Sequence, residues 1–250
     1  MEILPKRSRT INSLEFIFRD DCLFALNKCH SIHSTKLKDG GHASVADLLL
    51  REWPELKSVG DTEGDAGLIN RLDAATSGVL IGAFQREIWL SLRSQQSSGA
   101  IEKSYFALVE GRLEGIHKVD GYIASRSRKA KRVKVFMDKP KRGYRGLPAY
   151  STISYAGSFK EHTLVRVKIE RGRRHQIRAH CAFIGHPLIG DELYGATSRL
   201  DQFLEHDSQL LPSFFLHASR VVLQHPVSKD SMEISAAWPN YAKALKGVSE

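Results

Sequence analysis

Hydrophobic and polar residues alternate in several parts of the chain, which is the pattern of strands with one buried face. Two short apolar runs in 14–27, on either side of the acidic pair at 20–21, predict a strand, a turn and a strand. The segment TLVRVKIE at 163–170 alternates strictly, and IEKSYFALVEG at 101–111 combines alternation with aromatic residues. These runs predict a sheet whose strands come from distant parts of the chain.

Other segments repeat apolar residues every three or four positions, as an amphipathic helix does. Ser44 precedes one such segment, which Pro54 ends, and Phe84 begins another that stops near Gly99. A third helix is predicted in RHQIRAHCAFIG at 174–185, which ends in glycine.

Strands and helices are mixed without strict alternation. LINRLDAATSGVLIGAF at 68–84 predicts a strand, a turn and a strand with Asp73 in the loop, and 219–238 predicts a hairpin. The sequence shows no internal repeat. We therefore predict an α+β fold with a central, largely antiparallel or mixed sheet and a cleft between two halves.

The charge of the chain is concentrated in one place. The 250 residues are 42% hydrophobic and 26% charged, as in an ordinary folded protein, and the formal net charge is +9. Ten Lys or Arg and one Asp lie between Arg126 and Arg145, and the rest of the chain holds 27 basic and 27 acidic residues. A near-neutral body with one basic segment favours a polyanion partner, with nucleic acid as the first candidate.

Several classes of protein have no support in the sequence. No segment approaches the roughly 18–20 apolar residues of a membrane span, so a cytoplasmic protein without a membrane partner is expected. Three cysteines without C-x-x-C spacing argue against disulfides and structural zinc, and no acidic residue is placed among His175, His180 and His186. The sequence also lacks glycine-rich nucleotide loops and a G-x-S-x-G turn. We expect no metal and no cofactor.

Two polar segments could carry chemistry. Asp73 is followed by small polar residues, and an Asp in this setting is most often a turn former that bonds its own backbone. In RGRRHQIR at 171–178, arginines and free backbone N–H groups at a helix start can bind an anion, with Arg174 and Arg178 on one helical face. A solvated basic face is the alternative interpretation of this second segment.

Four segments in order resemble the motifs of the RluA-type family of pseudouridine synthases. NRLDAATSG at 70–78 is similar to the family's H-R-L-D-x-x-T-S-G, and KSYFALVEG at 103–111 is similar to its K-x-Y-x-A-x-V-x-G. RRHQIRAHCAFIGHPLIGDELYG at 173–195 resembles R-x-H-Q-I-R-x-H-x-x-x-x-G-H-P-I-x-G-D-x-x-Y-G. LHA at 216–218 and HP at 225–226 match the closing motifs.

The resemblance implies a pseudouridine synthase-like catalytic domain that isomerises a chosen uridine of RNA to pseudouridine. It makes Asp73 the essential catalytic residue, Arg178 the cation beside it, and Tyr105 the active-site tyrosine that can stack on the detached uracil. Without the motif, Tyr105 would be interpreted as a core strand residue. Further motif positions are assigned to substrate binding: Arg71, Thr76, Lys103, Arg173, Arg174, His175, Gln176, Ile177 and Leu216.

The chain departs from the family pattern at several positions. Asn70 stands where the family usually has His, so a proton role for that His does not carry over. After Lys28 the usual Pro-x-Gly turn is replaced by CHS at 29–31, Arg174 replaces a usual Thr or Ser, and AWP at 237–239 replaces Ala-Pro. These departures concern the choice of substrate more than activity.

The predicted domain organisation is simple. Residues 1–13 are expected to be a short N-terminal extension, too short for the folded RNA-binding module of some relatives, and 14–250 a single catalytic domain. RNA is the expected partner, with ribosomal RNA favoured over transfer RNA. We assign target selection to the 126–145 segment, in which Lys129, Lys131 and Arg132 are expected to contact phosphates. No obligate protein partner is indicated, and a monomer is expected.

Two other functions stay open from the sequence. The chain could be a non-catalytic RNA-binding or RNA-assembly protein on the same fold, although retention of Asp73, Tyr105 and Arg178 together weighs against this. It could also be a hydrolase that only releases the base, which would share the carboxylate but leave an abasic site.

Overall fold

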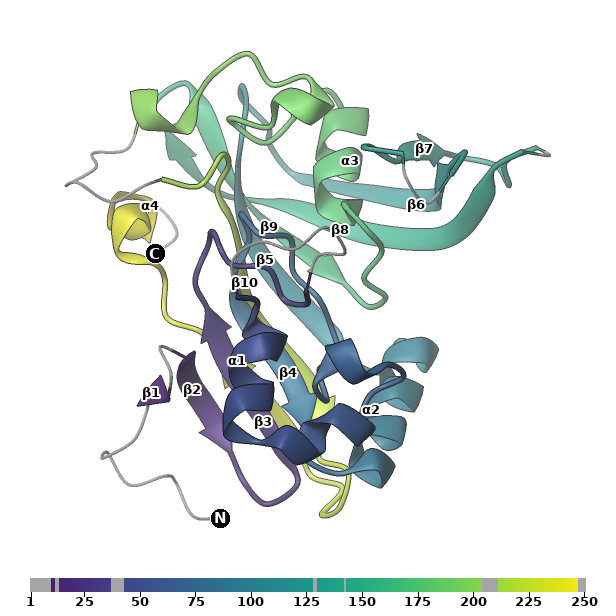
Figure 1. Cartoon of the computed structure of the whole chain (residues 1–250). Coiled ribbons are helices and arrows are strands. Elements are labelled where there is room, and N and C mark those ends of the chain that lie inside the picture. The colour runs from purple at the N-terminus through teal and green to yellow at the C-terminus, as the bar shows by residue number, and fades with distance from the viewer. Residues whose placement is uncertain are drawn as a thin grey trace. The chain divides into compact units, whose positions relative to one another are not determined.

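The computed structural model of the chain divides it into two compact units (Figure 1). The structure describes residues 10–11, 14–36, 43–127, 130–141, 143–203 and 211–246. Unit 1 holds the described residues up to Lys103 together with Ala218–Ala237, and unit 2 holds Ser104–His217 together with the described residues from Trp238 onward.

Unit 1 is built on strands that pair in the order β1-β2-β3-β4-β10, with β11 paired to β10. Their bounds are β1 Thr10–Ile11, β2 Leu14–Arg19, β3 Leu23–Lys28, β4 Ser77–Ala83, β10 Leu216–Gln224 and β11 Ser231–Ser235. The unit also contains α1 Val45–Glu52, α2 Arg86–Ser98 and the 3-10 helices η1 Pro54–Ser58 and η2 Glu63–Asp65. The predicted strands around 20–21 and the predicted hairpin at 219–238 are confirmed.

The helix ends of unit 1 follow from local sequence. Ser44 caps α1: its Oγ accepts a hydrogen bond from the Asp47 amide at 3.2 Å, and the Asp47 carboxylate accepts from the Ser44 amide at 2.9 Å. The bond from the Ser44 amide to the carboxylate lowers the pKa of Asp47. α2 ends at Gly99, whose φ of 89° is the left-handed conformation that favours glycine. Both predicted helices are therefore confirmed.

Unit 2 is built on strands in the order β5-β9-β8-β6-β7. Their bounds are β5 Glu102–Val109, β6 Ile116–Ser125, β7 Lys134–Phe136, β8 Arg145–Phe159 and β9 His162–Ile169. The helices are α3 Gln176–Phe183, α4 Lys243–Lys246 and the 3-10 helices η3 Glu192–Tyr194, η4 Leu200–Gln202 and η5 Asn240–Ala242. Alternate residues of β9 are buried and exposed toward its end, as its sequence predicts.

The structure corrects one prediction and adds two long strands. The expected strand before Asp73 is only a single bridge, Leu68 to Gly82. The Ile81 amide donates to the Asn70 side chain, so it is not available to the backbone of a continuing strand. β6 and β8 pair antiparallel over ten residue pairs, which the sequence did not predict. No helix in the described part of the chain is both long and apolar enough to cross a membrane.

Gly78 in β4 should be irreplaceable. Its φ is 105°, and a Cβ there would collide with the backbone of Ala218. Gly78→Ala should therefore lower the free energy of unfolding by about 2 kcal/mol or more, measured by urea denaturation. Gly64→Ala is the matched control, because nothing lies within contact distance of its Cβ position. Equal losses in the two variants would contradict this reading of Gly78.

Candidate active site

The loop that carries Asp73, residues 70–76, is fastened to the segment after β3. The Ser34 hydroxyl bonds both backbone groups of Leu72, at 3.0 Å to the carbonyl and 2.9 Å from the amide. The Ser31 amide donates to the Ala74 carbonyl at 2.9 Å. The Asp73 carbonyl accepts from the Thr76 amide at 3.0 Å, which closes a turn within the loop. The predicted turn is therefore present at Asp73, and the catalytic role of Asp73 stays a prediction.

Lys28, at the end of β3, is a buried cation beside this loop. It is only 3% exposed, and its Nζ donates to the carbonyls of Cys29 and Ile32 at 2.8 Å and of Ala74 at 3.2 Å. Burial lowers its pKa to about 8, against the opposing influence of Cys29 and Asp73, which favour the charged form. Lys28 thus joins the unusual 29–31 turn to the Asp73 loop.

The other predicted residues of the loop differ in their surroundings. Asn70 is buried, its Oδ1 accepts from the Ile81 amide at 2.9 Å, and its Nδ2 lies 3.4 Å from the Val79 carbonyl. Thr76 is buried, and its Oγ1 has no hydrogen-bond partner among the described residues. Arg71 is exposed and Asp73 is half-buried.

Arg178, on α3 of unit 2, is held by a buried carboxylate. Its Nε lies 2.6 Å from Oδ2 of Asp191 and its Nη2 lies 2.8 Å from Oδ1, which is a bidentate pair. Arg178 is 8% exposed and Asp191 is 2% exposed. The guanidinium also lies 4.5 Å from the ring centre of Phe214 and 5.1 Å from that of Tyr194. These contacts fix the position of the cation.

Gln176 joins the start of α3 to β8. Its Oε1 accepts from the Arg173 amide at 3.0 Å, and its Nε2 donates to the Tyr150 carbonyl at 2.8 Å and to the Ser151 hydroxyl at 3.0 Å. The Nε of Arg173 donates to the Pro148 carbonyl at 3.1 Å. These polar groups are therefore bound within the protein, and a substrate role for Gln176 and Arg173 stays a prediction.

Ser151 also bonds His180, another side chain of α3. The His180 Nδ1 lies 2.9 Å from the Ser151 Oγ, and burial lowers the pKa of His180 to about 4. His180 is therefore neutral at physiological pH.

The remaining predicted residues lie on β5, on β10, on α3 or directly before it, and in the basic segment. Four of them are buried: Lys103, Tyr105, Ile177 and Leu216. Arg174 is exposed and donates from Nη2 to the Ala130 carbonyl at 2.7 Å. Lys131 and Arg132 are exposed, and Lys129 lies outside the described residues.

The predicted residues are divided between the two units. Asp73, Arg71, Thr76 and Lys103 belong to unit 1, and the others that are described belong to unit 2. The pairing of Asp73 with Arg178 stays a prediction from the family resemblance. Sequence reasoning assigned no role to Asp191 or Tyr194, although both stand in the matched segment that ends at Gly195. Their presence in that motif was the signal that could have found them.

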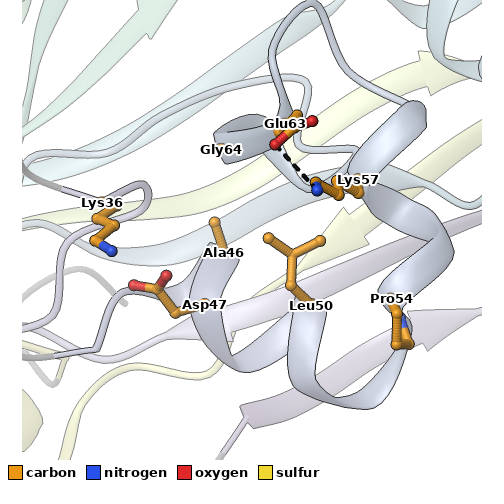
Figure 2. Close-up of a pocket in the computed structure, with 8 residues that line it drawn as sticks. All are labelled: Lys36, Ala46, Asp47, Leu50, Pro54, Lys57, Glu63 and Gly64. Carbon is orange, nitrogen blue, oxygen red and sulfur yellow. Dashed lines mark ion pairs between the residues drawn. The ribbon is translucent and has the colours of Figure 1, made fainter.

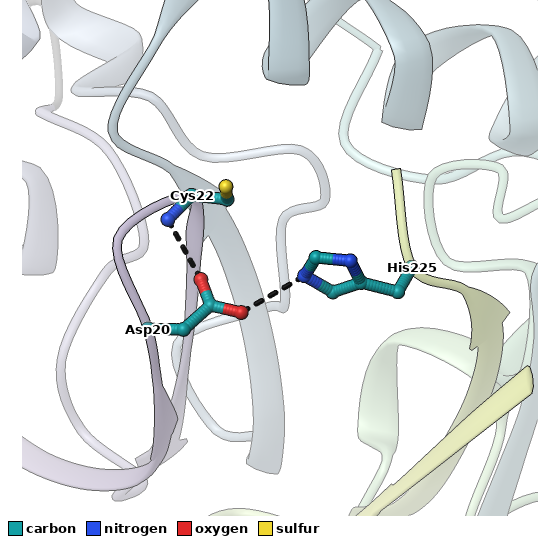
Figure 3. Close-up of side chains that lie close together, drawn as sticks. All are labelled: Asp20, Cys22 and His225. Carbon is teal, nitrogen blue, oxygen red and sulfur yellow. Dashed lines mark hydrogen bonds and ion pairs between the residues drawn. The ribbon is translucent and has the colours of Figure 1, made fainter. Parts of the chain in front are cut away.

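One group of side chains in the described part of the chain has donor atoms close enough for a metal ion: Asp20, Cys22 and His225 (Figure 3). Hydrogen bonds account for its geometry. The His225 Nδ1 faces the Val227 and Ser228 amides, so its Nε2 carries the proton, which points to Oδ2 of Asp20 at 2.9 Å.

The other atoms of this group also argue against a metal. Oδ1 of Asp20 accepts from the Cys22 and Leu23 amides at 2.7 Å each. Burial, followed by the charges of Asp20 and Asp21, raises the pKa of the Cys22 thiol, which disfavours the thiolate that a metal requires. These hydrogen bonds join the turn at Asp20 to the turn at His225, which explains the group better than a metal site does.

Two pockets lie away from the predicted residues. A pocket of about 290 Å³ in unit 1 is lined in part by Lys57 and Glu63, which form an ion pair with an N–O distance of 3.3 Å (Figure 2). A pocket of about 550 Å³ in unit 2 is lined by residues from Arg112 to Gly115 and by Tyr155, Ser158 and Thr163. Neither pocket is lined by a residue that the sequence assigns to the site.

Comparison with known proteins agrees with this fold and these motifs. One similar solved structure is that of the human protein titled RNA Pseudouridylate Synthase Domain Containing 1. The match covers 98% of this chain and 91% of the human chain, with a TM-score of 0.68 and 21% sequence identity. The fold is thus that of pseudouridylate synthase domains. The family model described as RNA pseudouridylate synthase matches residues 23–183. The chain belongs to this family, as its motifs predicted, and it is an isomerase that acts on RNA.

Curated bacterial proteins are similar over most of the chain. Ribosomal large subunit pseudouridine synthase D of Nitrosomonas europaea is 32% identical over 93% of this chain and 64% of its own length. The protein of the same name from Yersinia pestis is 30% identical over 95% and 72%, and ribosomal large subunit pseudouridine synthase C of Pasteurella multocida is 30% identical over 94% and 67%. The chain spans about two thirds of the length of these relatives.

Burial of Lys28 should make stability depend on pH. Its pKa of about 8 in the folded protein lies below the ordinary value of 10.5, so the unfolded chain binds more protons between these values. The free energy of unfolding should therefore gain up to about 3 kcal/mol from this group as pH rises through that window. Urea denaturation of wild type and Lys28→Met from pH 7.5 to 10.5 tests this.

Wild type should gain stability relative to Lys28→Met across this range. Lys57→Met, which removes an exposed lysine of the same unit, is the control and should follow wild type. Parallel curves for wild type and Lys28→Met would contradict the depressed pKa.

Proposed function

We propose that this enzyme isomerises specific uridines in structured RNA, with ribosomal RNA favoured over transfer RNA, and that Asp73 is its essential catalytic residue. The observation that carries the proposal is the retention of Asp73, Tyr105 and Arg178 in motifs that match the family. Three relatives named here, from three bacteria, carry names that assign them to the large ribosomal subunit, which favours ribosomal RNA.

The reaction requires one carboxylate and no outside group. The bond between the uracil nitrogen and the ribose must break, the base must turn while it is held, and carbon 5 must take the place of the nitrogen. A carboxylate at Asp73 can attack the substrate as a nucleophile, or it can stabilise positive charge that develops on the sugar. Isomerisation then ends with loss of the proton on carbon 5, which Tyr105 is placed by the family motif to assist.

Arg178 is suited to holding a second anion. A guanidinium has five N–H donors, and Asp191 uses the donors of Nε and Nη2. The family motif pairs this arginine with the catalytic carboxylate, and we assign the same pairing to Arg178 and Asp73. A nearby cation keeps a carboxylate ionised when substrate excludes water.

The basic hairpin, which we define as the described residues of 126–145 between β6 and β8, is suited to RNA phosphates. Its described Lys and Arg side chains are all exposed: Arg126, Lys131, Arg132, Lys134, Lys139, Lys141 and Arg145. The Arg126 guanidinium lies 5.4 Å from the ring centre of Tyr144, which itself packs on Phe136. Exposed cations with aromatic rings among them are typical of surfaces that bind nucleic acid.

Release of label from carbon 5 tests the reaction. RNA labelled with tritium at carbon 5 of uridine should release tritium to water with wild type, and Asp73→Ala should be slower by about a thousandfold or more. Asp61→Ala, which removes an exposed aspartate of the same unit, is the control and should retain activity. Equal release by wild type and Asp73→Ala would defeat the assignment, and free labelled uracil would indicate a hydrolase.

Charge reversal tests the basic hairpin. Lys131→Glu with Arg132→Glu should weaken RNA binding at low salt and reduce the slope of log affinity against log salt by about 1 to 2, because two phosphate contacts are lost. Arg51→Glu with Lys57→Glu makes the same charge change on exposed residues of unit 1 and should alter the slope less. Fluorescence anisotropy over a salt series measures both. Unchanged affinity in the hairpin variant would exclude this surface.

A further inference from the structure

Tyr194, in η3, lies where three predicted functional segments meet within unit 2. Its hydroxyl oxygen accepts from the amide of Val133, a residue of the basic hairpin, at 3.0 Å. The same oxygen lies 3.1 Å from Nδ1 of His175, directly before α3. The face of its ring lies 5.1 Å from the guanidinium of Arg178. One side chain therefore contacts the hairpin, the start of α3 and the predicted catalytic cation.

The hydroxyl group can satisfy both hydrogen bonds at once. Because a backbone amide N–H can only donate, the Tyr194 oxygen is the acceptor in the hydrogen bond with Val133. Its own proton is then available for Nδ1 of His175. Burial raises the pKa of Tyr194, so the proton is retained at physiological pH.

Two further contacts fasten the basic hairpin to α3 near this point. Arg174, which replaces a usual Thr or Ser of the family, donates to the Ala130 carbonyl at 2.7 Å. Val133 is buried in a small cluster with Ala179 of α3, against which Tyr194 packs. The hairpin is thus attached along residues 130–133 to the helix that carries Arg178.

We propose that Tyr194 is a positioning residue. It couples RNA binding by the basic hairpin to the position of the Arg178 guanidinium. The proposal rests on the function proposed above for the hairpin and for Arg178. The hydroxyl keeps the hairpin in the orientation that binds RNA, so less conformational freedom is lost on binding. The ring supports the guanidinium beside Asp191. Arg174 is the second fastener of the same hairpin.

The two parts of the tyrosine can be separated by mutation. Tyr194→Phe keeps the ring beneath Arg178 but removes the hydroxyl, so KM for RNA should rise roughly fivefold with kcat retained. Tyr194→Leu also removes the ring, and kcat should fall in addition. Tyr155→Phe is the matched control, because it removes the hydroxyl of an exposed tyrosine of β8, which lies 3.1 Å from the Ser158 hydroxyl.

A variant that combines three substitutions distinguishes coupling from a structural role. If the hydroxyl acts through the basic hairpin, Tyr194→Phe should add little to KM when Lys131→Glu and Arg132→Glu are already present. A purely structural tyrosine would lower the melting temperature, and the KM of Tyr194→Phe would match that of Tyr155→Phe. Thermal unfolding of every variant is measured beside the kinetics. If Tyr194→Leu does not fold, the KM of Tyr194→Phe alone distinguishes coupling from a structural role.

The outcomes separate this proposal from the one on which it rests. If charge reversal in the basic hairpin leaves RNA binding unchanged, the proposed RNA-binding role of the hairpin is wrong, and the coupling through Tyr194 is wrong with it. If charge reversal weakens binding but Tyr194→Phe matches Tyr155→Phe in KM, or adds fully to the charge reversal, the coupling through Tyr194 is wrong.

Discussion

The buried ion pair between Arg178 and Asp191 is the interaction on which the organisation of unit 2 depends. Removing both charges from water is costly, and only close bidentate geometry with further contacts offsets that cost. Loss of one partner from such a pair typically costs about 3–5 kcal/mol, because the other charge is then stranded. The pair therefore holds α3, η3 and the Phe214 segment in one arrangement, and every nearby side chain is placed relative to it.

Unit 1 uses a buried cation in a different way. No carboxylate of the described residues forms a bidentate pair with Lys28, and its ammonium group donates instead to backbone carbonyls from two loops. Carbonyl dipoles stabilise the charge less completely than a carboxylate does, which is consistent with a lowered pKa. The arrangement orders the Asp73 loop through the backbone carbonyl of Ala74.

Local signals in the sequence predicted much of the fold. The cap at Ser44, the left-handed stop at Gly99 and the alternation of β9 each depend on neighbours within a few residues, and each is confirmed. The bridge at Leu68 was mistaken for a strand, because nothing local shows that the Asn70 side chain replaces a backbone partner.

The motifs name candidate site residues, but the sequence does not give the contacts of these residues. The motifs supplied Asp73, Tyr105 and Arg178, whose placement in the chain needs no knowledge of the fold. The bond from Val133 to Tyr194 joins residues 61 apart, and the partners of a buried polar group at such separations are set by the register of strands and the packing of helices. Periodicity and spacing carry no record of these pairings.

Asn70 joins the edge of the Asp73 loop to β4 through its side-chain amide. Its amide supplies one acceptor to the Ile81 amide and one donor toward the Val79 carbonyl. A neutral imidazole offers the same pair, since one ring nitrogen accepts and the other donates. The contacts of Asn70 thus require one donor and one acceptor and no charge, so the loop is joined to β4 without a titratable group at this position.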